Sequence, residues 1–252
     1  MAVATTGEIA GWIRDANRVV VLTGAGISTE SGIPDFRGPQ GVWTRNPEAE
    51  KMASLQHYMG DREIRVRAWR SRTDHEAWTA QPNAGHVALA DLERKGKLHT
   101  LVTQNVDGLH QMAGSSPERI VEIHGTMRDV MCMSCGERAP MERALARVRA
   151  GEEDPPCRTC GGILKSATIS FGQQLVQTDL ERAYLAAEGC DLFLAVGTSL
   201  VVYPVADLPR VALAAGARLV IVNAEDTPYD GVASAVLRER IGAVLPEIVG
   251  LV

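Results

Sequence analysis

Long apolar runs, an excess of basic charge and an even number of cysteines are all missing from this sequence of 252 residues. No apolar run reaches the ~20 residues that cross a bilayer, and the N-terminus lacks the basic start and apolar core of a secretory signal. The net charge of -5 does not favour nucleic-acid or membrane binding through overall electrostatics, although a local basic patch is compatible with it. These absences predict a cytoplasmic protein with no membrane or nucleic-acid partner, in which cysteines stay reduced.

Four of the five cysteines form two close pairs, Cys132-Met-Ser-Cys135 and Cys157-Arg-Thr-Cys160. Two such pairs can bring four thiolates to a tetrahedral Zn²⁺, although the 21 residues between them slightly exceed the usual spacing. Sulfur would fill every position and leave none for an activated water, so the predicted zinc is structural. A redox dithiol pair and reduced cysteines without a metal are the alternatives. Cys190 precedes an apolar segment and is expected to be a buried apolar residue.

The remaining sequence alternates between apolar segments and helical patterns. The apolar segments, at residues 19–22, 101–103, 191–196 and 218–222, each end in small or polar residues. Such continuous apolar strands suit a parallel sheet that is buried on both faces, and residues 85–97 and 208–216 look helical. The pattern predicts a doubly wound α/β fold, in which ligands bind at the carboxyl ends of the strands.

Two stretches interrupt this alternation. Residues 39–82 are polar and rich in charge, and residues 127–166 hold the cysteine pairs around a helix-prone linker at 141–151. We interpret both as insertions that together form a small domain. The large domain then consists of residues 1–38, 83–126 and 167–252.

A glycine turn follows the first predicted strand in VVVLTGAGISTESGIPDFRG, residues 19–38. Main-chain N–H groups at Gly24-Ala25-Gly26 could approach a pyrophosphate closely. The common dinucleotide fingerprint has a third glycine where this chain has Thr29, and it has an acid at the end of the second strand. An ordinary tight turn is therefore the alternative, and neither interpretation explains the Asp35-Phe36-Arg37 that follows.

Polar side chains also follow the second predicted strand, at Gln104, Asn105 and Asp107. Amide and carboxylate groups at this place can recognise a carboxamide and ribose hydroxyls by hydrogen bonds. Capping of the next helix is the alternative.

Three histidines lie near strand or helix ends. His124 ends a short strand and could act as a general base near neutral pH, with a hydrogen-bonded structural role as the alternative. For His86, near a predicted helix start, we favour a structural role, and for His110 we favour a packing or surface role over catalysis. Further along, Phe171-Gly172 and the segment after residue 197 could hold an extended peptide between them, or could simply be loop and core.

Taken together, these motifs resemble the sirtuins, the NAD-dependent protein-lysine deacylases. The resemblance runs from Val19 to Asn223 and rests on GAGIS with GIPDFR, TQNVDGLH, the IHG histidine, both CxxC pairs, FG, GTSL and the VN strand end. It implies an α/β, Rossmann-like doubly wound parallel sheet, which binds NAD, with a smaller module of zinc ribbon plus helical insertion. NAD and an acyl-lysine protein or peptide would meet between the two.

The resemblance also implies roles for individual residues. The phosphates of NAD would contact Gly24, Ala25, Gly26 and Ser28, and its nicotinamide side would be covered by Asp35, Phe36 and Arg37. Ribose and nicotinamide would be bound by Gln104, Asn105 and Asp107. The rest of NAD would be held by Gly197, Thr198, Ser199, Asn223 and Ile241. Catalysis would rest on His124, Asn105 and Asp107, and the peptide would contact Phe171, Gly172 and Val201. The implied reaction cleaves NAD to nicotinamide and transfers the acyl group to ADP-ribose.

The sequence departs from the sirtuin pattern in one place and offers a variation in another. Gln173 stands where an acid commonly follows FG, which could weaken a preference for basic residues in the substrate. Trp69 and Arg72 stand about where members that prefer succinyl groups carry Tyr and Arg. Arg72 could therefore bind an acyl carboxylate, and a solvated charged helix is the alternative.

Other functions remain alternatives to deacetylation. Protein mono-ADP-ribosyl transfer would use the same NAD site, and a desuccinylase-type acyl preference would use Arg72. A zinc-ribbon binding module would have no enzymatic activity. A hydride-transferring dehydrogenase is disfavoured, because the third glycine and the acid are missing.

Overall fold

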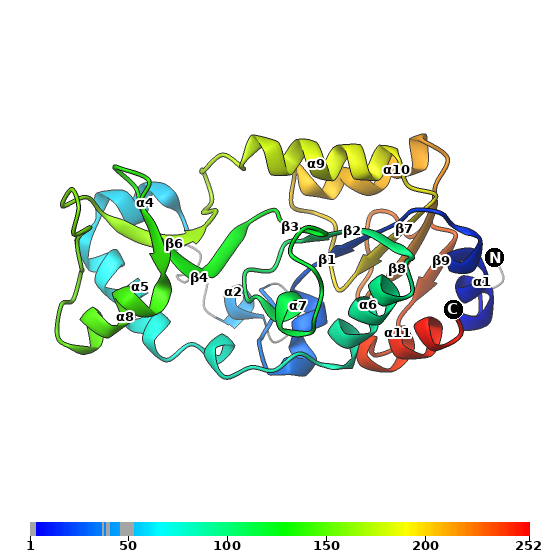
Figure 1. The fold of residues 1–252 in the computed structure, drawn as a ribbon, viewed down its shortest axis with the longest axis horizontal. Helices are drawn as coiled ribbons and strands as arrows, with labels where there is room; N and C mark the ends of the chain where they lie inside the picture. Colours follow the sequence, from blue (N-terminus) through cyan, green and yellow to red (C-terminus); the bar gives the residue numbers. More distant parts are fainter. Residues whose placement is uncertain (1–3, 37, 39–40, 46–52) are drawn as a thin grey trace.

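The computed structural model describes residues 4–36, 38, 41–45 and 53–252. Six strands form one parallel sheet in the order β3-β2-β1-β7-β8-β9 (Figure 1). The strands are β1 (Val19–Thr23), β2 (Leu98–Thr103), β3 (Ile120–Glu122), β7 (Leu192–Val196), β8 (Arg218–Val222) and β9 (Ala235–Leu237). Strand order reverses between β1 and β7, which creates the switch point where ligands bind in such sheets.

Helices cover both faces of this sheet, as a doubly wound fold requires. On one face lie α1 (Thr6–Asp15), α6 (Ala84–Arg94) and α11 (Ile241–Gly250), and on the other lie α9 (Gln177–Glu188) and α10 (Leu208–Ala214) (Figure 1). Val19 and Val21 of β1 pack toward the first group, and Val20 and Leu22 pack toward the second. Every side chain of β1 is buried, which explains its continuous apolar sequence.

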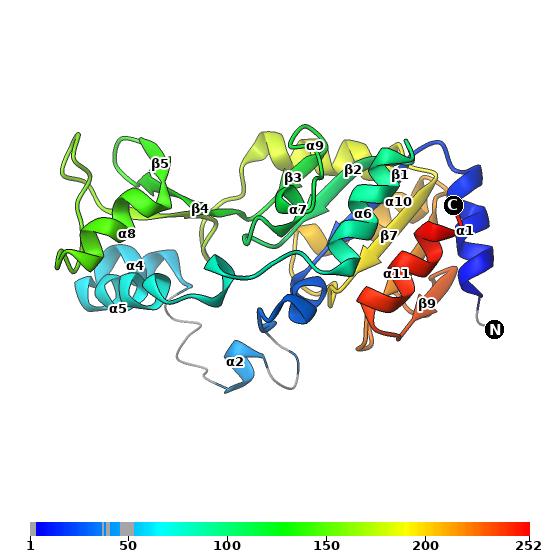
Figure 2. The same ribbon diagram turned by 60° about the horizontal axis from the view of Figure 1, so that its bottom comes forward.

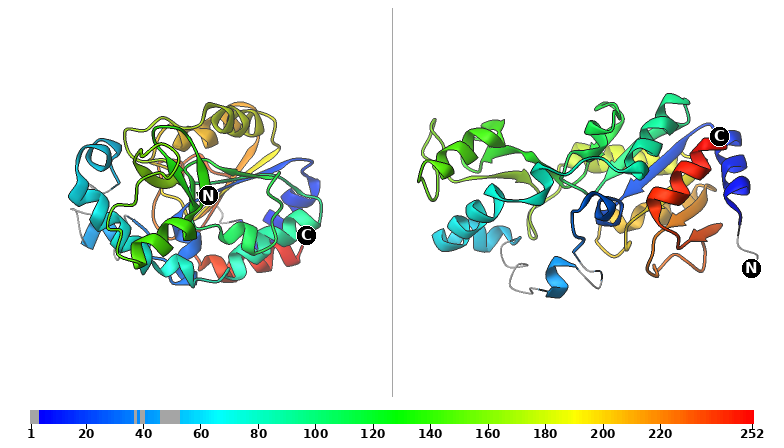
Figure 3. Two further views of the ribbon diagram at one scale, coloured as in Figure 1. Left: turned by 60° about the vertical axis from the view of Figure 1, so that its left-hand side comes forward. Right: turned by 90° about the horizontal axis from the view of Figure 1, so that it is seen from below.

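A small module stands beside the sheet (Figure 2). It contains an antiparallel sheet of order β5-β4-β6 and three helices. These elements are β4 (Gly125–Cys132), β5 (Arg138–Pro140), β6 (Leu164–Thr168), α4 (Leu55–Gly60), α5 (Arg62–Thr73) and α8 (Met141–Arg149). Its core packs Trp69 of α5 against Val130, Leu145 and Leu164. In Figure 3 the small module lies at the opposite end of the molecule from α1 and α11.

Short turns of helix complete the fold. They are η1 (Ala25–Ser31), α2 (Val42–Arg45), η2 (Glu76–Trp78), α7 (Leu109–Met112) and η3 (Val205–Asp207). No helix in the described part of the chain is long and apolar enough to cross a membrane.

The predicted architecture is confirmed. The four predicted strands are β1, β2, β7 and β8, the two predicted helices are α6 and α10, and the helix-prone linker is α8. The sequence interpretation missed β9, which is only 3 residues long. Cys190 is buried, as predicted.

Candidate functional site

The glycine turn is interlocked with the end of β7. Gly26 N donates to Gly197 O at 2.8 Å, and Gly24 N donates to Val196 O at 3.1 Å. A Cβ on Gly24 would lie 2.7 Å from Gly197 O, and one on Gly197, whose φ is +61°, would lie 2.3 Å from Ile27 N. Only glycine permits this approach, which holds the turn against the end of β7 at the switch point. The turn is the predicted phosphate cradle; the N–H groups of Gly24 and Gly26 are used within the chain, and Ala25 lies between them.

A buried hydrogen-bond network lies behind the glycine turn. Asn105 Nδ2 donates to Gly24 O at 3.0 Å and to Ser28 Oγ at 3.1 Å. Ser28 Oγ in turn donates to Asp107 Oδ2 at 2.8 Å. The other carboxylate oxygen of Asp107 accepts from Leu109 N at 3.0 Å, so Asp107 also caps α7. The structure therefore brings together three predicted site residues, and the capping role coexists with this grouping.

The polar ends of β2, β7 and β8 lie along the same edge of the sheet. Gln104 Nε2 donates to Thr198 Oγ1 at 2.9 Å, which links the ends of β2 and β7. Half-buried Ser199 follows Thr198. Asn223, just after β8, donates through Nδ2 to Glu225 O at 2.8 Å, and Ile241 is buried at the first turn of α11.

His124 follows β3 and is mostly buried. Its Nδ1 lies 3.1 Å from Gln104 O. Because a carbonyl oxygen only accepts, Nδ1 must carry the proton, which leaves the Nε2 lone pair available. Burial lowers the pKa of His124 below 6.5, while the hydrogen bond to Gln104 acts in the opposite direction. The ring is therefore neutral at pH 7 and can accept a proton at Nε2.

The sequence interpretation missed a second buried network, which includes His110. Thr23 and Thr103 are paired across β1 and β2, and Thr23 Oγ1 donates to Thr103 Oγ1 at 2.8 Å. His110 Nε2 lies 3.0 Å from Thr23 Oγ1, and Thr103 Oγ1 accepts from Asn105 N at 3.1 Å. Burial lowers the pKa of His110 to about 3, so its ring is neutral. Because the Thr23 hydroxyl proton already goes to Thr103, Nε2 must carry the ring proton and donate to Thr23 Oγ1. The network thus fixes the backbone of Asn105 through the hydrogen bond of its N–H to Thr103 Oγ1.

We expect Thr23→Val to lower the free energy of unfolding by about 1–3 kcal/mol, because it leaves a buried donor on His110 unpaired. Valine keeps the shape of threonine and removes only the hydroxyl. The matched control is Thr23→Ser, which keeps the hydroxyl and should restore much of the loss. Urea unfolding at pH 7 measures both variants, and equal stability of the Val and Ser proteins would contradict the network.

Asp35 fixes the segment after the glycine turn through two hydrogen bonds. Asp35 Oδ1 accepts from Gly38 N at 3.0 Å, and Asp35 O accepts from Val42 N at 2.8 Å. The Phe36 side chain is 44% exposed. Arg37, the third predicted residue here, lies outside the described residues.

Both main-chain groups of Phe171 are already paired within the chain. Phe171 N donates to Ala53 O at 2.8 Å and Phe171 O accepts from Leu55 N at 2.9 Å, in a parallel bridge with Ser54. A bound peptide could therefore pair with the backbone beyond Phe171, where Gly172 has a φ of +80°. Val201, the other predicted peptide contact, is 46% exposed.

Arg72 lies between two aromatic rings of the small module. Its guanidinium carbon is 5.5 Å from the Tyr58 ring centroid and 5.4 Å from that of Trp69, and NH2 donates to Ser166 Oγ at 3.2 Å. NH1 is buried and has no hydrogen-bond partner among the described residues. Burial, followed by the charge of Arg72, lowers the pKa of the neighbouring Lys165 to about 7.

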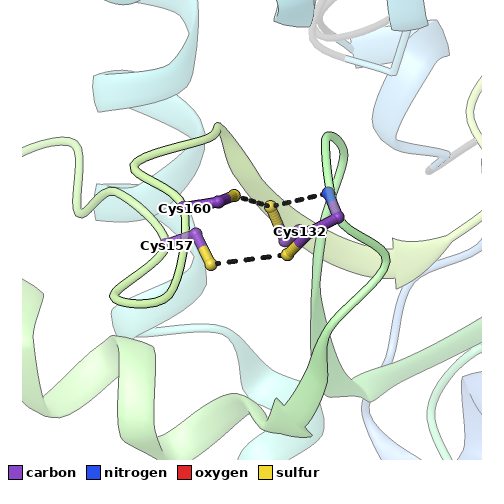
Figure 4. Close-up of side chains that lie close together, drawn as sticks. Cys132, Cys157 and Cys160 are labelled. Carbon is purple, nitrogen blue, oxygen red and sulfur yellow. Dashed lines mark hydrogen bonds between the residues drawn. The ribbon is translucent and has the colours of Figure 1, made fainter.

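The four paired cysteines converge from two facing loops (Figure 4). The Sγ atoms lie within 4.8 Å of one another, with Cys132 to Cys160 at 3.5 Å and Cys135 to Cys157 at 3.8 Å. Four Zn–S bonds of about 2.3 Å in a tetrahedron place sulfurs about 3.8 Å apart, so this donor set fits zinc. Against the effect of burial, N–H donors of Cys135 and Ser134 lower the pKa of the Cys132 thiol to about 6. Against the effect of the Gly162 N–H, hydrogen bonds with Cys132 and Cys135 raise the pKa of the Cys160 thiol.

The fold and the site define a class of protein: a Rossmann-like nucleotide-binding sheet with a four-cysteine zinc module beside it. Comparison with known families is more specific, because a model described as the Sir2 family matches residues 24–204. The chain therefore belongs to the Sir2 family, as its resemblance to the sirtuins implied.

Individual relatives agree with this assignment. The chain is 56% identical over 230 residues to NAD-dependent protein deacetylase 2 of Streptomyces coelicolor, which covers 91% of this chain and 95% of the relative. A solved structure of Sir2 with a deacetylated p53 peptide and 3′-O-acetyl ADP-ribose matches with a TM-score of 0.90 at 31% identity, covering 98% of both chains. Another, of Sir2 with a p53 peptide and NAD+, has a TM-score of 0.87 at 32% identity and the same coverage.

Proposed function

We propose that this protein is an NAD-dependent protein-lysine deacetylase, which cleaves NAD to nicotinamide and transfers the acetyl group to ADP-ribose. The observation that carries the proposal is His124, with an available Nε2 lone pair, bonded to Gln104 at the edge of the sheet where the glycine turn lies. The similarity to a deacetylase and to peptide-bound Sir2 structures supports the same reaction and an acyl-lysine peptide as the partner.

We assign the catalytic steps to three residues. Asn105 and Asp107, held through Ser28, orient the nicotinamide so that its bond to the ribose can break. The substrate acyl oxygen then captures the ribose carbon. His124 accepts a proton at Nε2 from a ribose hydroxyl, which makes that hydroxyl nucleophilic toward the bound acyl group.

Further residues hold the substrates and exclude water. The glycine turn and Ser28 bind the phosphates of NAD, and Thr198, Ser199, Asn223 and Ile241 bind the rest of the nucleotide. Phe36 covers the reactive ribose carbon against water. The four cysteines hold structural zinc, because sulfur fills every coordination position.

The direct test is incubation of the full chain with NAD and an acetyl-lysine peptide. We expect one acetyl-ADP-ribose and one nicotinamide for each peptide deacetylated. ADP-ribose attached to protein, without loss of acetyl groups, would favour a mono-ADP-ribosyltransferase instead. Absence of nicotinamide release would favour a zinc-ribbon binding module.

Arg72 supports a second candidate activity, on acyl groups that end in a carboxylate. Its NH1 has no partner among the described residues, and a carboxylate would supply one. We expect Arg72→Gln to lower the ratio of succinyl-peptide to acetyl-peptide kcat/KM by about 10- to 100-fold, the range for a lost charge-assisted hydrogen bond. Exposed Arg67 of the same helix provides the control variant, Arg67→Gln. An unchanged ratio in Arg72→Gln would leave Arg72 with a packing role.

Two further predictions accompany this function, the domain boundaries and the cellular location. We keep the predicted domain boundaries, because the cofactor cradle lies on the large sheet and the cysteine cluster in the small module. The predicted cytoplasmic location rests on the sequence, as argued above.

A further inference from the structure

An open groove of about 800 Å³ lies at the opposite end of the sheet from His124 and Asn105. It forms where edge strand β3 is shorter than β2, because β3 pairs only with residues 101–103 of β2. Helix α9 borders the groove on one face of the sheet. Its lining includes Arg18, His99, Thr100, Arg119, Arg182 and Leu185. Nothing in the proposed deacetylation uses this groove.

Two of the arginines are fixed in place by neutral acceptors. Arg119 NH1 donates to Leu98 O at 2.8 Å and to His99 O at 3.3 Å. Arg182 donates through NH1 to Ile120 O at 3.1 Å and through NH2 to Glu118 O. Carbonyl acceptors orient a guanidinium without cancelling its charge, so both cations are positioned in advance of any ligand.

The third arginine has no competing partner. Within the described ranges, the Arg18 guanidinium makes no hydrogen bond or ion pair, and its side chain is exposed. Among the described residues, one carboxylate is paired with these arginines, that of Glu93, whose Oε1 lies 3.7 Å from Arg119 Nε. Glu118 and Glu181 also line the groove.

The charges of the three arginines affect the pKa of His99. Burial first, and then the charges of Arg18, Arg119 and Arg182, lower the pKa of His99 below 6.5. Its Nδ1 lies 2.9 Å from Thr100 Oγ1, which fixes the ring within the groove. His99 is an exposed residue of β2, and the charges of all three arginines act on its imidazole although the net charge of the whole chain is -5. The three arginines therefore gather at one place, beside the two glutamates of the lining.

We propose that the groove is a second binding site, which takes a small phosphorylated metabolite whose phosphate oxygens contact Arg18, Arg182 and His99. A guanidinium group binds phosphate through paired hydrogen bonds. One guanidinium is enough for a single carboxylate, so a groove with three of them favours a phosphate ligand. The volume lies in the range of small-molecule sites. The acidic net charge disfavours a nucleic-acid strand, whose binding needs an extended basic surface.

The test uses inorganic pyrophosphate as the probe and the full chain with ADP-ribose in excess, so that the glycine turn is already filled. NMR titration of the histidine ring protons follows the pKa of His99, assigned with a His99→Gln variant. We expect pyrophosphate to raise the pKa of His99 toward 6.5 or above, because a bound anion offsets the three guanidiniums. An unchanged pKa would overturn the proposal.

Two variants show whether binding depends on this groove. Arg18→Gln should weaken pyrophosphate binding about tenfold and should by itself raise the pKa of His99. Arg67→Gln, an exposed arginine of α5 in the small module, should change neither. Equal pyrophosphate affinity in the two variants would show that the site lies elsewhere. The His99 readout does not depend on deacetylation, so its failure and the failure of the proposed function are distinguishable.

Discussion

We expect the replacement of His124 with alanine to abolish deacetylation and to leave the thermal midpoint close to that of the unaltered protein. The catalytic loss follows from the removal of Nε2, the proton acceptor for the ribose hydroxyl. The expected loss of stability is small, because within the described residues the side chain makes a single hydrogen bond, to Gln104 O. A peptide assay with quantified acetyl-ADP-ribose, run beside thermal unfolding, measures both effects.

A further readout separates this role from NAD binding. The proton transfer follows cleavage of nicotinamide, so the His124→Ala protein should still exchange labelled nicotinamide into NAD when acetyl peptide is present. The active form of His124 is neutral, and burial lowers its pKa below 6.5. The kcat/KM of the unaltered enzyme should therefore hold near neutrality and fall as pH drops through that lowered pKa. Deacetylation by His124→Ala at the original rate would refute the assignment.

Replacing Cys132 with alanine should release zinc and destabilise the small module. Cys132 and Cys157 are buried in the core that contains Trp69 and Leu164, so the cysteine cluster and this core form one unit. Zinc bound to four thiolates contributes directly to folding free energy. We expect the melting temperature to fall by on the order of 10 °C or more, with metal content dropping to zero.

Cys190→Ala is the matched control for the cysteine variant. Cys190 is buried but belongs to the apolar cluster between the large sheet and α9, far along the chain from the two pairs. This control should keep its zinc and lose only a modest amount of stability. Metal analysis and calorimetry of both proteins decide the matter: a Cys132→Ala protein that lacks zinc and melts normally would rule out a structural metal.

The large sheet was predictable because its strands are buried on both faces. A strand such as β1 must then be apolar at every position, and polar residues are left to mark its end. The cysteine cluster was predictable for a related reason, since two short-range pairs already set most of its geometry. β9 gave no comparable signal, because three residues are too few to establish a pattern.

Contacts that depend on strand register, or on segments far apart in the chain, could not be predicted from the sequence. The Thr23–Thr103 hydrogen bond exists because β1 and β2 align these residues side by side, and periodicity along one strand does not reveal its neighbour's register. Likewise, nothing local to Phe171 indicates that Ala53 and Leu55 occupy its main-chain groups. His86, for which we favoured a structural role, lies 3.5 Å from Ser28 Oγ through Nε2, a contact between segments 58 residues apart.

The interlocked glycines affect when the entropy of the cofactor loop is lost. Gly24 and Gly26 are tied to the end of β7 through main-chain hydrogen bonds that join groups of the chain itself and need no ligand. The conformational freedom of this segment is therefore given up once, when the chain folds, and not again each time NAD binds. An enzyme that consumes its NAD must rebind a fresh molecule in every cycle. A rigid cradle spares each cycle the repeated cost of ordering the loop.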